Sequence, residues 1–443
     1  MRFAHKPCGS VHNHGLTTLI VLVVSGMIGS GVFTTTGHAV ETLGSTTAVL
    51  AAWLLAGVIA ICGAIGYATI ATLLPSSGGE YLYLSRRFHP FVGFLAGWVS
   101  LTAGFSGSIA LAAKTCETYV RPLLGVPTDV PPQVIASVIV ITCGIGHAFI
   151  GMSATLCTNT LTILKMFAIG LFIAFGFASL DDTTPQLIAE SHHFSLGAFA
   201  STVMWISFSY AGFNQAVYIA SEAQEPEKNI PRALLAGTLI TTVAYMLLNY
   251  LFLQAGPLEN ISGQDDVAAI AAGELGGTWL ETSIRGIIAM ATLTSVAGMM
   301  MTGPRVYAQM SEDGVFPNYF SGDRGISRSV LLQMSTALVL VHCSTILELL
   351  RFMGVTLSMF SALAVATIWT HHPAKEDSHR RISCGARGAA ALFIVSTICL
   401  IALMLIHDPR QLAGTACLLV VGSALWQFRK CKRHVPKTKQ EQG

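Results

Sequence analysis

Long apolar runs recur along the whole chain, and this feature restricts it to a membrane-spanning helical fold. Runs such as 49–70, 91–113 and 388–406 each provide about the 20 residues that a helix needs to cross a bilayer. Of the 443 residues, 52% are hydrophobic and 11% are charged, which excludes an ordinary soluble protein. The runs predict about twelve spans, at 16–40, 47–72, 91–119, 133–155, 158–179, 196–221, 232–255, 281–308, 329–349, 353–371, 388–406 and 411–428.

The distribution of Lys and Arg predicts how these spans are oriented. With the predicted spans, most of the 25 Lys and Arg residues fall on the same side of the membrane as the N-terminus. In membrane proteins the side richer in Lys and Arg is the cytoplasmic side. The first apolar segment is too long for a signal peptide and has no small-residue cleavage site, so it is interpreted as a span. We therefore expect a multi-pass protein of the cell membrane, plasma or inner, with both termini cytoplasmic.

Two of the predicted spans contain glycine-rich interruptions. The first is Gly26-Met27-Ile28-Gly29-Ser30-Gly31 within 16–40, and the second is Ser209-Tyr210-Ala211-Gly212-Phe213 within 196–221. Each backbone group without a hydrogen bond in lipid costs several kcal/mol, so such spans persist only where protein or a water-filled cavity covers them. Two interrupted spans at corresponding positions of two halves are typical of a transporter binding site at the membrane midplane. The alternative is that these glycines only kink or pack the helices.

The two ends of an interrupted helix carry opposite partial charges. The first half ends in unpaired carbonyls and the second begins with unpaired amides, which bind anions. At the first interruption Met27 offers a carbonyl, while residues 29–31 offer amides. At the second, Phe208 and Ala211 offer carbonyls. A ligand with a carboxylate and an ammonium on adjacent atoms fits these poles, and an α-amino acid is such a ligand.

Four sequence motifs resemble those of a known family. Ile28-Gly29-Ser30-Gly31-Val32-Phe33 is similar to the first-helix motif of the amino acid–polyamine–organocation (APC) superfamily of permeases. The segment from Gly212-Phe213-Asn214-Gln215 to Asn229-Ile230-Pro231 resembles the sixth helix and following loop of its L-type amino acid transporter branch. Pro75-Ser76-Ser77-Gly78-Gly79-Glu80-Tyr81 and Asp313-Gly314-Val315-Phe316-Pro317 match two further cytoplasmic signatures.

This resemblance implies an all-α membrane protein with a LeuT-type fold. Ten core helices would form a 5+5 inverted repeat in which helices 1 and 6 are broken, and two peripheral helices would follow. The chain then divides into an N-terminal cytoplasmic tail at 1–15, a transport core at 16–371 with repeats at 16–179 and 196–371, peripheral helices at 388–428 and a basic cytoplasmic tail at 429–443.

The resemblance also implies roles for individual residues. Ser30 and Gly31 would hold the substrate carboxylate, and the carbonyls of Met27, Phe208 and Ala211 would bind its amino group. Phe208 would also cover the substrate as an aromatic lid, and Phe213 with Asn214 would line the side-chain pocket. The L-type branch commonly has Trp where Phe213 stands, which leaves the substrate size open. The predicted substrate site comprises Met27, Ile28, Gly29, Ser30, Gly31, Phe208, Ala211, Gly212, Phe213 and Asn214.

Lys165 lies inside the fifth predicted span, where a charged side chain is costly and points to a function. In similar permeases a lysine here bridges the first and eighth helices, at the place where sodium-driven relatives bind a cation. We therefore expect Lys165 to replace that cation and transport to be independent of sodium. The alternative is that its ammonium reaches the cytoplasmic surface along its own helix.

Several other charged residues have two interpretations. Glu222 and Arg305, at the inner ends of the sixth and eighth spans, would pair in an inner gate or serve as interfacial anchors, and Glu80 has the same alternatives. Lys114 and Glu117, at i and i+3, are expected to form a local ion pair. Among the histidines only His147 is predicted to lie within a span, in a structural role.

The sequence lacks the motifs of an enzyme or an ATP-driven pump, namely a phosphate loop, a nucleophile elbow and paired intramembrane carboxylates. Its ten cysteines are scattered singly, so we predict no metal site and no cofactor. No nucleic-acid partner or heavy-chain subunit is inferred; the expected partners are a small amino acid and the lipid bilayer. The prediction is a secondary amino acid carrier, for neutral L-amino acids, that works by alternating access with proton symport or exchange. A polyamine or organic-cation carrier and a non-transporting amino acid sensor are the alternatives.

Overall fold

The computed structural model describes residues 14–73, 79–127, 129–150, 155–180, 195–322, 324–370 and 382–433. These residues form helices and their connections, and their only β pairing is one isolated bridge between His14 and Ala223. Most of the predicted tails, at 1–13 and 434–443, and residues 75–78 of one predicted signature lie outside the described residues.

Each predicted span overlaps a helical segment, and the first and sixth predicted spans are each divided. The first consists of α1 (Leu16–Met27) and α2 (Gly31–Leu43), and the sixth of α9 (Leu196–Ser209) and the 3-10 helix η3 (Gln215–Glu222). The other long segments are α3 (Thr46–Leu73), α5 (Pro90–Val99) continued by the π-helix η1 (Ser100–Gly107) and α6 (Ser108–Leu123), α7 (Val134–Ile145) with η2 (Gly146–Ile150), α8 (Thr155–Ser179), α10 (Pro226–Gln254), α12 (Val267–Glu312), α13 (Gly325–Cys343), α14 (Ile346–Ala366) with η5 (Thr367–Thr370), α15 (Cys384–His407) and α16 (Ala413–Arg433). Short helices α4 (Gly79–Arg87), α11 (Leu258–Ile261), η4 (Asn318–Phe320) and η6 (Pro409–Leu412) connect them.

Eight helical segments in the described part of the chain are long and apolar enough to cross a membrane. The chain is therefore a multi-pass membrane protein. Shorter apolar helices lie at Val134–Phe149, Ile163–Ser179 and Leu196–Ser209. The division into twelve spans with an inverted repeat stays a prediction.

Local signals fix several helix ends. Pro90 starts α5, where its missing amide costs nothing, and the His89 ring accepts a hydrogen bond from the amide of Phe91. Thr345 and Glu348 form a reciprocal capping box at the start of α14, which satisfies two amides that the helix itself leaves free. Gly44 ends α2 with a φ of 60°, a conformation that favours glycine.

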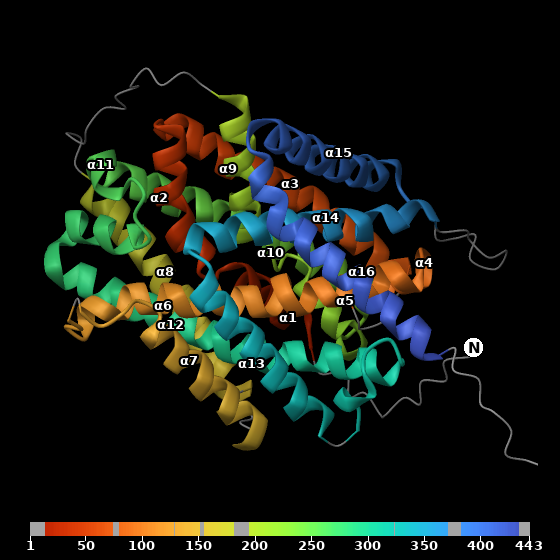
Figure 1. Ribbon diagram of the computed structural model, residues 1–443. Coiled ribbons are helices and arrows are strands. Elements are labelled where there is room, and N and C mark those ends of the chain that lie inside the picture. The colour runs from red at the N-terminus through yellow and green to blue at the C-terminus, as the bar shows by residue number, and fades with distance from the viewer. Residues whose placement is uncertain are drawn as a thin grey trace, which may run out of the picture.

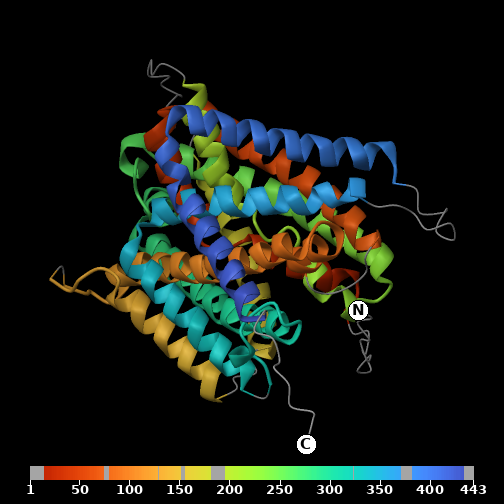
Figure 2. The ribbon, with the colours of Figure 1, turned by 45° about the vertical axis from the view of Figure 1, so that its right-hand side comes forward.

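The long helices run roughly in one direction, so the bundle has two ends (Figure 1). The first end carries α4 and the last turn of α16, while α11 lies at the opposite end. α15 and α7 flank opposite sides of the bundle in both views (Figures 1 and 2). α10 packs along α3 and α1, and this places it beside the first interruption.

Candidate functional site at the two interrupted helices

The first interruption separates α1 from α2. The Ile28 amide still donates to the Val24 carbonyl, at 2.9 Å, and the Gly29 amide donates back to the Met27 carbonyl, at 2.8 Å. The chain then turns, and α2 begins at Gly31. The first amides of a helix have no acceptor within it, so those at the start of α2 can receive an anion. Met27, Ile28 and Ser30 are all buried, and Ser30 is 5% exposed.

The second interruption follows the end of α9 at Ser209. The Ala211 amide donates to the Phe208 carbonyl, at 2.8 Å, and the Gln215 amide donates to the Gly212 carbonyl, at 2.9 Å. Gly212 has a φ of 105°, which is available to glycine and strained for other residues. The chain resumes as a 3-10 helix instead of an α-helix, so its carbonyls and amides near Gly212 differ in direction from those of a regular span.

The two interruptions touch each other directly. A Cβ atom on Gly212 would lie 2.7 Å from the Gly26 carbonyl oxygen, and one on Gly31 would lie 2.5 Å from the Ser209 hydroxyl oxygen. Glycine is therefore favoured at both positions, at Gly212 because the Gly26 backbone lies too close for a side chain and at Gly31 because Ser209 does. In addition, the Thr35 hydroxyl lies 3.3 Å from that of Ser209. The two predicted halves of the site are thus adjacent.

Tyr245 of α10 joins the two interruptions, a role that no sequence motif predicted. Its hydroxyl lies 2.5 Å from the Met27 carbonyl oxygen and 2.9 Å from that of Ser209. The phenol is fully buried. One turn further along, Asn249 accepts a hydrogen bond from Thr36 of α2. A polar stripe at helical spacing, Thr238, Thr241, Thr242, Tyr245 and Asn249, is the sequence signal that could have identified this face.

Lys165 of α8 lies beside the first interruption. Its ammonium donates to the Ile28 carbonyl at 2.7 Å and to the Ser25 carbonyl at 3.5 Å. The side chain is 6% exposed, so it does not reach along α8 toward the surface. Its polar contacts within the described residues go to the α1 end, where carbonyls carry partial negative charge.

Phe213 and Asn214, directly after Gly212, contact α3, α15 and the carboxylate of Glu80. The Phe213 ring packs edge-on against Tyr67 of α3, with ring centroids 5.4 Å apart, and also contacts Phe393 of α15. The Asn214 amide nitrogen lies 3.4 Å from Oε1 of Glu80. Their predicted role as the lining of a side-chain pocket stays a prediction. Phe208 is half-buried and packs against a cluster of buried hydrophobic residues, and its helix α9 contacts α14.

In this structure Glu222 contacts His14 and not Arg305, and the role of both residues in an inner gate or as interfacial anchors stays a prediction. Glu222 Oε2 lies 3.6 Å from Nε2 of His14, and the backbones of His14 and Glu222 are hydrogen-bonded at 3.3 Å. Arg305 is exposed on α12 and has no ion pair with Glu222. His14, two residues before α1, thus lies against the end of η3.

The predicted Lys114–Glu117 ion pair is also wrong. The Glu117 carboxylate accepts from Arg121, at 3.2 Å, and from the backbone amides of Gln133 and Ala136. Lys114 instead donates to the Val341 carbonyl at 3.0 Å. The partner of Glu117 lies one turn further on, where the chain folds back into α7.

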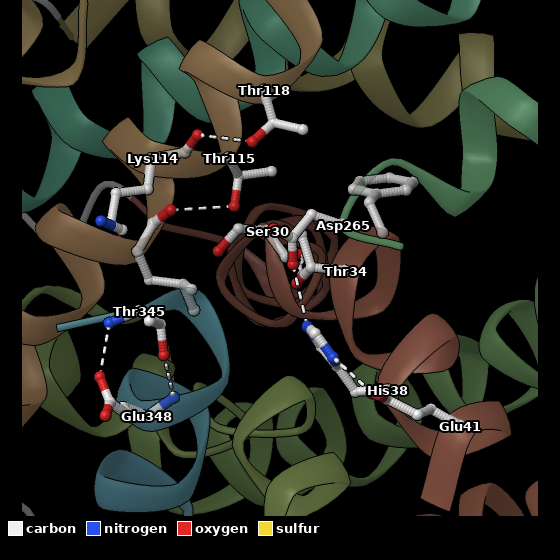
Figure 3. Close-up of polar contacts among 12 residues, drawn as sticks. Ser30, Thr34, His38, Glu41, Lys114, Thr115, Thr118, Asp265, Thr345 and Glu348 are labelled. Atoms are coloured by element: carbon white, nitrogen blue, oxygen red, sulfur yellow. Dashed lines mark hydrogen bonds and ion pairs between the residues drawn. The ribbon is translucent and has the colours of Figure 1, made fainter. Parts of the chain in front are cut away.

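His38 lies buried in α2, although the sequence analysis placed only His147 within a span. Its Nε2 is 2.9 Å from Oδ1 of Asp265, in the loop before α12. Figure 3 shows Ser30, Thr34 and His38 on the face of α2 that is directed toward this loop and toward Thr115 of α6. His38 and Asp265 thus join α2 to the loop before α12.

The sequence of this chain is similar to those of known transporters. The sequence profile of a family described as "Amino acid permease" matches residues 15–439. The Asc-type amino acid transporter 1 of Mus musculus is 25% identical over 319 residues, which cover 69% of this chain and 59% of that protein. The large neutral amino acids transporter small subunit 2 of Homo sapiens is 26% identical over 370 residues, 80% of this chain and 68% of that protein. The serine/threonine exchanger SteT of Bacillus subtilis is 28% identical over 311 residues, 68% and 69% of the two chains.

Proposed function

Because this chain belongs to the amino acid permease family, we propose that it is a sodium-independent secondary carrier of neutral L-amino acids that works by alternating access. The family assignment confirms the resemblance that the sequence motifs predicted. The chain spans 59% of the mouse Asc-type transporter, so its activity and substrate are proposed here from its own residues. The observation that carries the proposal is the direct contact between the two interruptions at Gly26, Gly31, Ser209 and Gly212.

The contact brings amide and carbonyl groups together in a buried place. The amides of Ser30 and Gly31 would hold the carboxylate of the substrate, and the carbonyls of Phe208 and Ala211 would accept from its ammonium group. The Met27 carbonyl already accepts from Gly29 and Tyr245. It would bind an ammonium group only by exchanging one of these bonds, so substrate binding would displace the Gly29 amide or the Tyr245 hydroxyl from it.

The side-chain end of the substrate would meet Phe208 as a lid and Phe213 with Asn214 as the pocket. Asn214 is neutral, which disfavours a dedicated cationic substrate. The names of two relatives refer to neutral amino acids: large neutral amino acids in the human protein, and serine and threonine in the Bacillus subtilis protein. Both points support neutral substrates.

Lys165 supports sodium independence. Its ammonium already contacts the carbonyls at the end of α1, and carbonyl oxygens are the groups that coordinate sodium in transporters with interrupted helices. The ammonium of Lys165 would replace a bound cation at these carbonyls. Uptake measured with sodium replaced by choline should then be unchanged.

The proposal includes the twelve-helix LeuT-type arrangement, with the core at 16–371 and both termini in the cytoplasm of a cell membrane. In this arrangement the His14–Glu222 contact would close the inner side and would separate during opening. Arg305 would act there without contacting Glu222.

Counterflow in proteoliposomes tests the proposal. The purified protein is reconstituted, the vesicles are preloaded with one amino acid at a time, and uptake of labelled amino acid is measured. Gly31→Val should abolish counterflow because its Cβ would lie 2.5 Å from the Ser209 hydroxyl oxygen. Gly170→Val is the matched control, since Gly170 lies exposed on α8 with no atom near its Cβ position. Full activity of Gly31→Val would contradict the proposal.

A further inference from the structure

Glu80 is a buried carboxyl group that the proposed substrate site does not use. It lies in the first turn of α4, and its residue is 6% exposed. Oε1 accepts hydrogen bonds from three neutral donors: the Tyr67 hydroxyl of α3, the Ser361 hydroxyl of α14 at 3.0 Å, and the Asn214 amide at 3.4 Å. These donors come from three different elements, so one carboxyl oxygen holds α3, α14 and the second interruption together.

Glu80 has no basic partner in the described part of the chain. No Lys, Arg or His there lies within ion-pair distance of it, and the titratable groups that face it are two phenols, Tyr67 of α3 and Tyr218 of η3. A buried carboxylate without a cation is costly. Burial accordingly raises the pKa of Glu80, while the hydrogen bonds from Tyr67 and Ser361 oppose that rise.

The contacts around Glu80 connect it to the substrate site. Asn214, one of its donors, is two residues beyond Gly212, where the interruptions touch. The Tyr67 ring, which carries another donor, packs against Phe213. On the other side of α4, the Tyr81 hydroxyl donates to Asp313 at the end of α12, at 2.7 Å. α4 therefore connects α3, α14 and α12 at the end of the bundle where the last turn of α16 lies (Figure 1), and Glu80 is its link to the second interruption.

We propose that Glu80 is the proton-binding site that couples amino acid transport to the proton gradient. This inference rests on the proposed function and names its coupling ion. Oε1 already accepts three hydrogen bonds, so the proton resides on Oε2. In the closed arrangement described here the buried carboxyl binds a proton. When the end of the bundle around α4 opens, Asn214 and Ser361 separate from Glu80, water reaches the carboxylate, and the proton is released on that side.

The sign of this coupling follows from linkage. A carboxyl whose proton affinity is higher in the closed state than in the open state favours closure when protonated and opening when ionised. A more acidic outside therefore favours protonation of Glu80 and the closed state. A less acidic inside favours opening and release of the proton. Net uptake should increase when the outside is the more acidic compartment, because each unit of pH difference is a tenfold ratio of protons.

The test compares Glu80→Gln with Glu312→Gln in proteoliposomes. Gln keeps an oxygen that accepts the three hydrogen bonds but cannot bind the proton. Glu312 is exposed at the end of α12 and serves as the matched control. Counterflow at equal pH should remain in all proteins. Net uptake into empty vesicles should rise about tenfold at most for a one-unit acid-outside gradient in the wild type and in Glu312→Gln, and should not respond in Glu80→Gln.

Proton-driven accumulation that persists in Glu80→Gln overturns the inference, as does a wild type that exchanges amino acids without moving protons. In both cases the proposed function stands. If the wild type fails to exchange any amino acid, the proposed function itself fails. Should Glu80→Gln not insert, Tyr67→Phe decides. Loss of one donor to the carboxylate should shift the pH profile of uptake to higher pH, and an unshifted profile overturns the inference.

Discussion

Tyr245→Phe removes one oxygen atom from the place where the two interruptions meet. The hydroxyl has a single hydrogen, which is shared between the carbonyl oxygens of Met27 and Ser209 at 2.5 and 2.9 Å. The Met27 carbonyl keeps its bond from Gly29, so the change leaves chiefly the Ser209 carbonyl without this donor. A buried acceptor left unsatisfied costs about 1–3 kcal/mol. This cost corresponds to about a 5- to 150-fold change in the equilibrium between the tied and untied arrangements.

The assay is counterflow at several substrate concentrations, together with substrate binding in detergent. Tyr245→Phe should change the apparent affinity or the exchange rate by at least about fivefold, the lower limit of that range. Tyr250→Phe is the control on the same helix, because Tyr250 is 41% exposed and stacks on Phe177. If the two variants have the same affinity and the same rate, Tyr245 does not join the interruptions in a way that matters for transport.

Three further results are expected. Gly212→Ala should lower exchange at least tenfold, because φ is 105° and the new Cβ would lie 2.7 Å from the Gly26 carbonyl oxygen; Gly286→Ala, which has open space at its Cβ position, should leave exchange unchanged. Lys165→Met should abolish exchange or make it dependent on added cation, and unchanged exchange in choline buffer would show that the ammonium is dispensable. Glu80→Gln should melt higher than the wild type near neutral pH. Because burial raises the pKa of Glu80, the wild type loses stability as the pH rises from about 4.3, the ordinary value. The melting temperatures of the two proteins should therefore diverge as the pH rises from acid to neutral. A difference that stays constant with pH would contradict this prediction.

The sequence could predict the interruptions because lipid makes uncovered backbone costly. Glycines inside an apolar run can be recognised from the sequence alone. Gly29, Ser30, Gly31 and Gly212 lie in the interruptions, as the pattern predicted. The motif order was also sufficient for the family assignment, which the profile match over residues 15–439 confirms.

The partners of polar side chains could not be predicted in the same way. Glu222 and Arg305 are both expected at the inner ends of spans, but the partner that Glu222 has in this structure, His14, lies before α1. Glu117 was paired with Lys114 by helical spacing, but the loop after α6 returns and offers two amides. These choices depend on how connections fold back, and spacing within one helix contains no information on that.

Tyr245 and Glu80 illustrate a second kind of gap. Each is a single polar residue whose meaning depends on contacts between elements more than 100 positions apart in the chain, such as Tyr245 with Met27 and Glu80 with Ser361. Tyr245 could have been found from the polar stripe on its helix. Glu80 was noted as a gate residue or an interfacial anchor, but its burial could not be predicted, because it follows from the packing of α4 against α14.

The most direct test asks whether the substrate site needs both charges of an amino acid. Counterflow of a labelled neutral amino acid is measured against three competitors: the same amino acid, its analogue without the carboxylate, and its analogue without the amino group. Opposite helix ends that meet at Gly31 and Ser209 predict strong competition by the first and little by the other two. Equal competition by the amine alone would show that the amides at Ser30 and Gly31 hold no carboxylate.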